Sequence, residues 1–211
     1  MSGFLIVSFF TTDTPYVEVM REHLGASVER LGVPHRLYAV EPQGSWRKNV
    51  SLKPSVILRA LEEHPEQDVV FIDADGTLET YPALFDAVPD EYDIAAHYLN
   101  WNDWYGYTDD PPTLELLSGT MFFRNTAGVK SLVRQWHADT MISGHREREQ
   151  KILQRLLQPE RVYRLPLAYC WIATLPNGTP PRAARPDPVV VSHAQVSRHL
   201  HAVVNAIQEP A

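Results

Sequence analysis

Two aspartates separated by a single residue follow a short apolar run in the middle of the chain. The run covers residues 69–72, and Asp73 and Asp75 come directly after it. Such a run is typical of a buried parallel strand, and open α/β sheets bind ligands just beyond the carboxyl ends of these strands. Two carboxylates a few ångströms apart repel each other by about 1 to 4 kcal/mol, whereas a divalent cation turns them into a binding site. Because hard oxygen ligands suit Mg²⁺ or Mn²⁺, the spacing favours a metal site over a merely solvated corner.

The elements before this motif alternate between strand and helix. We expect strands at residues 4–10, 35–40 and 69–72, with helices at 15–31 and 53–61 between them and a polar loop at 41–50. Both helices carry apolar residues at helical spacing and have a proline in the first turn, where its missing N–H costs nothing. This alternation predicts an α/β fold with a mostly parallel sheet and right-handed crossovers.

The second half of the chain is less regular. We expect strands at residues 93–97, 119–123, 162–165 and 189–191, and helices at 127–141 and 147–157. The segment 98–112 is too aromatic for an idle linker and too polar for a core. The proline-rich stretch 176–188 predicts a loop or lid.

Composition limits the classes of protein to consider. The 211 residues predict a single domain over residues 1–211, and the net charge of −7 argues against general nucleic-acid binding. The single cysteine, Cys170, excludes an internal disulfide and a cysteine-based zinc site, and its apolar neighbours predict a buried, inert thiol. We see no targeting or transmembrane segment, so a cytoplasmic location is the default expectation.

The stretch Ile-Asp-Ala-Asp-Gly-Thr-Leu at residues 72–78 resembles the first motif of the haloacid-dehalogenase-like phosphatases. That resemblance would make Asp73 the phosphoryl nucleophile and Asp75 a general acid, with Mg²⁺ between them and the substrate. The context differs, because two strand–helix units precede the motif here. The later acidic pair Asp109-Asp110 lies in an aromatic loop and does not follow an apolar run. A phosphatase therefore stays as an alternative.

From Phe4 to about Leu200, the chain resembles more closely the GT-A glycosyltransferases, the nucleotide-diphospho-sugar transferase fold. The order of several features carries this resemblance. Asp73-Ala74-Asp75 in mid-chain is similar to the DxD motif, the strand from Ser118 is similar to the one behind the sugar site, and His193 follows a late apolar strand. The resemblance implies a single GT-A-like domain that transfers a sugar from a nucleotide-diphosphate sugar.

The resemblance also implies roles for individual residues. The metal, Mn²⁺ or Mg²⁺, would be held by Asp73, Asp75 and His193, and the imidazole favours Mn²⁺. Glu149 and Gln150 would be catalytic groups beside the sugar. Donor-binding roles fall on Phe10, Thr11, Tyr16, Arg47, Lys48, Lys53, Asp73, Ala74, Ser118, Gly119 and Arg198. Arg198 stands at best for a lysine that the family has near this point, in a segment 189–211 expected to close over the metal and donor.

The acceptor and the stereochemistry stay open at this stage. The aromatic loop 101–105 suits an acceptor platform, since aromatic rings stack on sugar faces, but core or dimer packing explains it nearly as well. His193 and the Glu149-Gln150 pair favour a retaining outcome, whereas an inverting enzyme needs a carboxylate base, for which Asp103 is a candidate. We expect a nucleotide-sugar donor and a glycan, lipid-linked sugar or small-molecule acceptor. A donor-binding protein without turnover is the third alternative.

Overall fold

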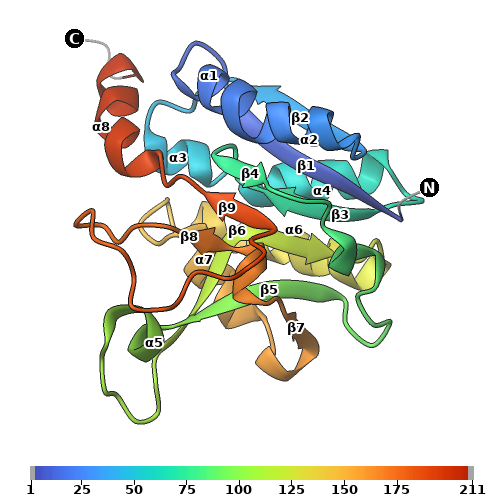
Figure 1. The fold of residues 1–211 in the computed structure, drawn as a ribbon. Helices are drawn as coiled ribbons and strands as arrows, with labels where there is room; N and C mark the ends of the chain where they lie inside the picture. The colour runs from blue at the N-terminus through green and yellow to red at the C-terminus, as the bar shows by residue number, and fades with distance from the viewer. Residues whose placement is uncertain (1–2, 209–211) are drawn as a thin grey trace.

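A six-stranded central sheet organises the protein in the computed structural model, which describes residues 3–208 (Figure 1). β6 is antiparallel to both of its neighbours, and the other neighbouring pairs are parallel. The expected mostly parallel α/β sheet is therefore confirmed. In spatial order, the strands are β2 (His35–Val40), β1 (Phe4–Thr11), β3 (Asp68–Ile72), β6 (Leu114–Phe123), β5 (Ile94–Asn100) and β7 (Val162–Arg164).

A second, three-stranded sheet begins just after β3. It consists of β4 (Gly76–Leu78), β9 (Val191–His193) and β8 (Trp171–Ile172), in that order. β4 and β9 are antiparallel, and their register sets Gly76 opposite His193. The small sheet thus brings a residue from the end of the chain next to the Asp73-Ala74-Asp75 motif.

Helices cover both faces of the central sheet. The first helical stretch runs without a break through α1 (Tyr16–Met20), a π-helical turn η1 (Arg21–Gly25) and α2 (Ala26–Leu31). The other α-helices are α3 (Trp46–Val50), α4 (Lys53–Glu63), α5 (Trp101–Tyr105), α6 (Ala127–Ile142), α7 (Glu149–Leu156) and α8 (Ser197–Gln208). Short 3₁₀ turns are η2 (Ala83–Asp86), η3 (Pro159–Arg161) and η4 (Leu167–Tyr169).

The core lies on both sides of the sheet because successive strand residues point to opposite faces. On β3, Val69 and Phe71 face the cluster that contains α4, α6 and α7, whereas Val70 and Ile72 face the first helical stretch and the small sheet. All four side chains are fully buried. This two-sided burial explains why the strand is an unbroken apolar run.

Several expected boundaries were wrong. Residues 41–50 include the helix α3, whose first turn is capped where Ser45 Oγ accepts from the Lys48 N–H at 3.3 Å. β6 begins at Leu114, five residues earlier than expected. The last strand covers Val191–His193, so His193 lies within the strand. Over residues 3–208, none of the helices combines the length and the apolar character that a bilayer crossing requires.

Candidate active site

A cavity of about 810 Å³ opens at the carboxyl ends of β1 and β3. Its walls also include residues from α1, α3, α5, α7, α8, β5, β6, β8 and β9. Its volume lies within the range of small-molecule sites, and its position is where α/β sheets bind ligands. The DxD aspartates lie in this cavity, which makes it the candidate active site.

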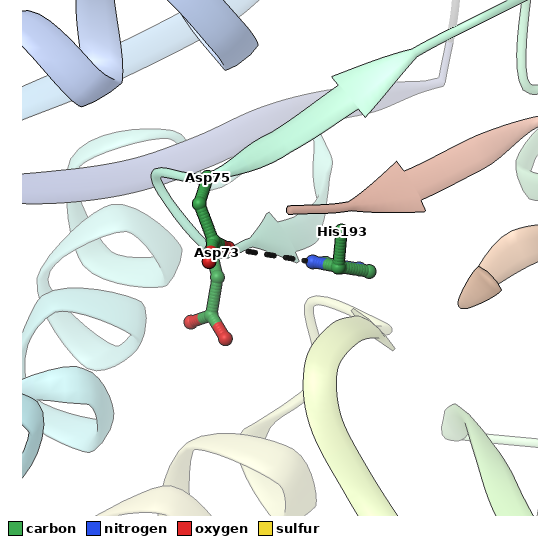
Figure 2. Close-up of side chains that lie close together, drawn as sticks. All are labelled: Asp73, Asp75 and His193. Carbon is green, nitrogen blue, oxygen red and sulfur yellow. Dashed lines mark ion pairs between the residues drawn. The ribbon is translucent and has the colours of Figure 1, made fainter. Parts of the chain in front are cut away.

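Asp73, Asp75 and His193 converge in the cavity (Figure 2). One ligand atom from each side chain lies within 4.8 Å of the others. His193 Nε2 is 2.9 Å from Thr120 Oγ1, which fixes the plane of the ring. His193 Nδ1 is 3.7 Å from Asp75 Oδ1 and has no hydrogen-bond partner among the described residues, although it is buried. An orphaned imidazole nitrogen facing a carboxylate is the arrangement that a metal ion would satisfy.

The space around this group is kept open by glycines. A Cβ atom on Gly119 would lie 3.0 Å from His193 Cε1 and 3.3 Å from Asp73 Oδ2. A Cβ atom on Gly76 would lie 2.5 Å from Ile72 Cγ2. Glycine at these positions lets the backbone approach the ligand side chains closely. Two carboxylates, one imidazole and this clearance fit a divalent ion.

The charges on the two aspartates are set by different neighbours. Burial raises the pKa of the Asp73 carboxyl, and the nearby Lys53 ammonium opposes this shift. Burial also acts to raise the pKa of Asp75, but the His193 imidazole and the Val196 backbone N–H outweigh it and hold that pKa below its usual value. The Val196 N–H donates to Asp75 Oδ2 at 2.9 Å. Asp75 is therefore the more firmly ionised carboxylate.

Lys53 lies next to Asp73, and its ammonium group is bound by protein atoms. Its ammonium is 2.9 Å from Asp73 Oδ1 and 3.4 Å from Glu149 Oε1, and it donates to Ser118 O at 3.0 Å. Burial acts to lower the pKa of Lys53, but Asp73 and Glu149 outweigh it and raise that pKa. The lysine is therefore charged, and its donors are directed at protein atoms.

The first turns of α7 are joined to the free edge of β6. Gln150 Oε1 accepts from the Ser118 N–H at 3.1 Å, and Gln154 Oε1 accepts from the Leu116 N–H at 3.0 Å. Ser118 Oγ also donates to Glu149 Oε1 at 3.0 Å. These bonds satisfy backbone donors on the part of β6 that extends beyond β3. They also fix the Glu149 and Gln150 side chains at the cavity wall.

The far end of the cavity is lined by aromatic rings from α1 and α3. Trp46 Nε1 donates to the Tyr16 hydroxyl at 3.3 Å, and the Trp46 and His201 ring centroids are 6.2 Å apart. The Trp46 backbone N–H donates to Asn205 Oδ1 at 2.7 Å, which holds α8 against α3. Burial raises the pKa of Tyr16, so its phenol is neutral. This end offers a partly apolar surface with a few polar atoms.

Known structures share this architecture. A glycosyltransferase involved in glycosylation of the major capsid of PBCV-1 superposes with a TM-score of 0.66 and 15% identity, over 97% of this chain and 98% of that one. The galactosyltransferase LgtC, solved with donor and acceptor sugar analogs, has a TM-score of 0.54 and 9% identity, over 97% and 95%. The chain has the GT-A fold.

The glycosyltransferase GlyE of Streptococcus pneumoniae TIGR4 has a TM-score of 0.57 and 13% identity. The match covers 81% of this chain and 47% of GlyE, so this chain spans about half the length of that protein. No family model and no curated protein sequence matches the chain. The structural comparison thus confirms the GT-A resemblance that the order of sequence features implied.

Within this GT-A fold, most of the residues singled out from the sequence line one cavity. These are Phe10, Thr11, Tyr16, Arg47, Lys53, Asp73, Ala74, Asp75, Ser118, Gly119, Glu149, Gln150, His193 and Arg198. Lys48 is exposed and lies outside the cavity lining of the described chain. Its backbone N–H donates to Ser45 Oγ in the cap of α3. Asp103 is exposed on α5 and likewise lies outside that lining.

The structure bears on two further expectations about single residues. Lys53 was expected among the donor-binding residues, and in the structure its ammonium is held by Asp73, Glu149 and Ser118. Cys170 is buried, as expected.

The sequence analysis missed several cavity residues. Glu115 is a single acidic residue in an otherwise apolar stretch, a signal that could have been recognised. His201 and Asn205 come from α8 and gave no local signal, since only the packing of α8 on α3 brings them to the cavity.

Proposed function

We propose that this protein is a metal-dependent glycosyltransferase that transfers a sugar from a nucleotide-diphosphate sugar to an acceptor hydroxyl group. One observation carries the proposal: Asp73, Asp75 and the unpartnered Nδ1 atom of buried His193 converge in the main cavity of a GT-A fold. The resemblance to the haloacid-dehalogenase-like phosphatases is confined to residues 72–78, whereas the likeness to glycosyltransferase structures extends over most of the chain.

The metal site would be formed by the two aspartates and the histidine. Mn²⁺ or Mg²⁺ fits this donor set, and the imidazole favours Mn²⁺. When bound, the ion supplies Lewis-acid stabilisation for the negative charge that develops on the departing diphosphate. Lys53 keeps Asp73 in place, and Thr120 orients the His193 ring.

The donor would lie along the cavity, with its base near Tyr16 and Trp46 and its sugar near Ser118 and Gly119. The aromatic rings at the α1–α3 end provide an apolar surface for a base. Arg47 and Arg198 line the cavity and are partly exposed, so their guanidinium groups suit the diphosphate better than the enclosed Lys53 ammonium does.

Glu149 and Gln150 remain our candidates for the groups beside the reacting sugar carbon. Their hydrogen bonds to Ser118 hold them at the cavity wall, so they need no reorganisation when charge develops on the sugar. We favour a retaining outcome, as the resemblance implies. Asp103, the base considered for an inverting enzyme, lies outside the cavity lining among the described residues, which supports this preference.

The proposal is tested by thermal unfolding with uridine and guanosine diphosphates, with and without Mn²⁺. We expect a rise in melting temperature only when nucleotide and metal are both present, and loss of that rise in Asp73→Asn. Asp139→Asn, at a partly exposed position of α6 outside the cavity lining of the described residues, is the matched control. No rise with either nucleotide would overturn the proposal.

Turnover separates the remaining alternatives. Incubation with a panel of nucleotide sugars and Mn²⁺ should release nucleoside diphosphate, and NMR of the product should show a retained anomeric configuration. Release of phosphate from an aryl phosphate, abolished by Asp73→Asn, would instead support the phosphatase. Nucleotide binding without any turnover would support the non-catalytic binder.

A further inference from the structure

Three aromatic rings form a cluster beside the cavity, at and after α5. The ring centroids of Trp101 and Tyr105 are 5.8 Å apart, those of Trp101 and Tyr107 are 5.9 Å apart, and those of Tyr105 and Tyr107 are 5.6 Å apart. Tyr105 lines the cavity, and Tyr107 is 50% exposed. The cluster therefore extends from the cavity wall to the outer surface.

Core packing accounts for these rings only in part. The buried residue of α5 is Trp104, which is 3% exposed and lies 5.6 Å from the ring of Trp171, and the partly exposed Trp101 and Tyr105 pack against the cluster around it. Trp101, Tyr105 and Tyr107 all keep part of their surface in solvent. An exposed group of rings next to a cavity is a feature of binding surfaces.

Glu115 connects this cluster to the candidate sugar-binding wall. Its Oε1 atom accepts from Gln150 Nε2 at 2.9 Å, and its Oε2 atom accepts from Trp101 Nε1 at 3.0 Å. Each carboxylate oxygen can accept two hydrogen bonds, so each retains one position. Glu115 lines the cavity, and its two neighbours hold it in one orientation.

This combination has the chemistry of sugar recognition. Rigid aromatic faces cover the C–H face of a sugar ring at low entropic cost, and a fixed carboxylate accepts hydrogen bonds from its hydroxyl groups. The Glu115 carboxylate lines the cavity beside these rings and disfavours an anionic group in contact with it. A neutral sugar matches the rings and the charge.

We propose that Trp101, Tyr105, Tyr107 and Glu115 form an acceptor subsite for a neutral sugar. One acceptor hydroxyl group donates to Glu115, which places it next to Gln150, while the acceptor ring lies against Tyr105 and further sugar units extend over Tyr107. This inference rests on the proposed glycosyltransferase function, and it identifies the acceptor as a carbohydrate.

The test uses the full chain with uridine or guanosine diphosphate and Mg²⁺, which is diamagnetic and therefore suits NMR. Saturation-transfer difference NMR is recorded with methyl glucoside, methyl galactoside, N-acetylglucosamine, lactose, maltose and cellobiose. We expect saturation transfer to at least one sugar, strongest at the C–H protons of one face. Titration of that sugar then gives its dissociation constant for each variant.

Tyr107→Ala should weaken sugar binding by about tenfold, which matches the loss of one aromatic contact. Glu115→Gln keeps the shape of the side chain but removes its charge, and it should weaken binding further when combined with Tyr107→Ala. Tyr81→Ala, which removes an exposed tyrosine outside the cavity lining of the described chain, is the matched control and should bind the sugar as the parent does.

The outcomes separate this inference from the proposed function. If the nucleoside diphosphate and metal stabilise the protein but no sugar in the panel shows saturation transfer, the acceptor inference is wrong and the proposed function stands. Equal sugar affinity of Tyr107→Ala and Tyr81→Ala would also overturn it. If nucleotide and metal fail to stabilise the protein, the proposed function itself fails.

Discussion

The ammonium group of Lys53 lies 2.9 Å from a carboxylate oxygen of Asp73, at a depth where only 5% of the lysine side chain is exposed. Glu149, with 7% of its side chain exposed, contacts the same ammonium. Removing one partner of a buried ion pair leaves a buried charge without compensation, at a cost of about 3 to 5 kcal/mol. We expect Lys53→Met to lower the free energy of unfolding in urea by about this amount.

Lys151→Met is the matched control, because Lys151 is exposed on α7. Its effect should stay within about 0.5 kcal/mol. The double variant Lys53→Met with Glu149→Leu should recover part of the lost stability, since it also removes a buried charge. Equal stability of Lys53→Met and Lys151→Met would show that the buried charges do not depend on each other.

A methyl group on Gly119 would make tight contacts with the proposed metal ligands, at 3.0 Å from His193 Cε1 and 3.3 Å from Asp73 Oδ2. Because an added Cβ atom would crowd His193 and Asp73, we expect Gly119→Ala to abolish the stabilisation by nucleotide and Mn²⁺. Overpacking of this kind should lower the free energy of unfolding by about 1 to 3 kcal/mol. Thermal unfolding with and without both ligands measures the two effects together.

Gly128→Ala is the control for that variant. Gly128 lies in α6, and the nearest atom to its added Cβ is Thr126 Oγ1 at 3.8 Å. Alanine in a helix is favoured over glycine by up to about 1 kcal/mol, so this variant should be slightly stabilised and should bind both ligands normally. Metal-dependent stabilisation that survives in Gly119→Ala would contradict the proposed site.

Thr120 is expected to act on the metal through His193. Its hydroxyl lies 2.9 Å from His193 Nε2, and such outer hydrogen bonds typically change metal affinity by about 10- to 100-fold. Thr120→Val should weaken Mn²⁺ binding within this range, measured by electron paramagnetic resonance of free Mn²⁺. Thr140→Val, at a buried threonine in α6, should leave the affinity unchanged. A loss in both variants would point to general destabilisation.

Stability should fall in mild acid, partly because of His97. Burial lowers the pKa of His97 in the folded protein, and a hydrogen bond to Leu165 O only partly opposes this shift. The unfolded state therefore binds more protons as the pH falls below about 6.5, and folding loses stability until the pH reaches the folded pKa of His97.

The matched pair for this effect is His97→Gln and His199→Gln, since His199 is exposed. Urea unfolding between pH 7.5 and 5 should show a smaller loss of stability in His97→Gln than in the parent. His199→Gln should follow the parent. Identical slopes in all three proteins would rule out a contribution from His97.

The strands of the first half could be predicted because residues 4–10 and 69–72 are apolar runs buried on both faces. The helix α3 could not be predicted, because its five residues are too few to show a helical spacing of apolar side chains. A cap from Ser45 and a bond to Asn205, 159 positions from Trp46, hold this helix. β6 was predicted five residues too short because Glu115 and Ser118 interrupt its apolar pattern.

In the candidate site, too, local features could be predicted from the sequence and long-range contacts could not. The motif of Asp73 and Asp75 is local, so the carboxylate pair could be recognised directly. The enclosure of Lys53 could not, because its partners come from β6, α7 and the end of β3, which only the tertiary fold brings together. Whether a charged side chain is enclosed by partners depends on such long-range contacts. A local sequence pattern does not predict these contacts.

Asp75 is a candidate metal ligand and also binds the segment between β9 and α8. Its backbone carbonyl accepts from the Ala194 N–H at 3.1 Å, and its carboxylate accepts from the Val196 N–H at the entrance to α8. Substituting this aspartate would therefore remove the hydrogen bond from the Val196 N–H that holds the start of α8, as well as a candidate metal ligand. Experiments that aim to isolate the contribution of the ion should alter His193, whose imidazole interacts with the side chains of Thr120, Asp75 and Cys170.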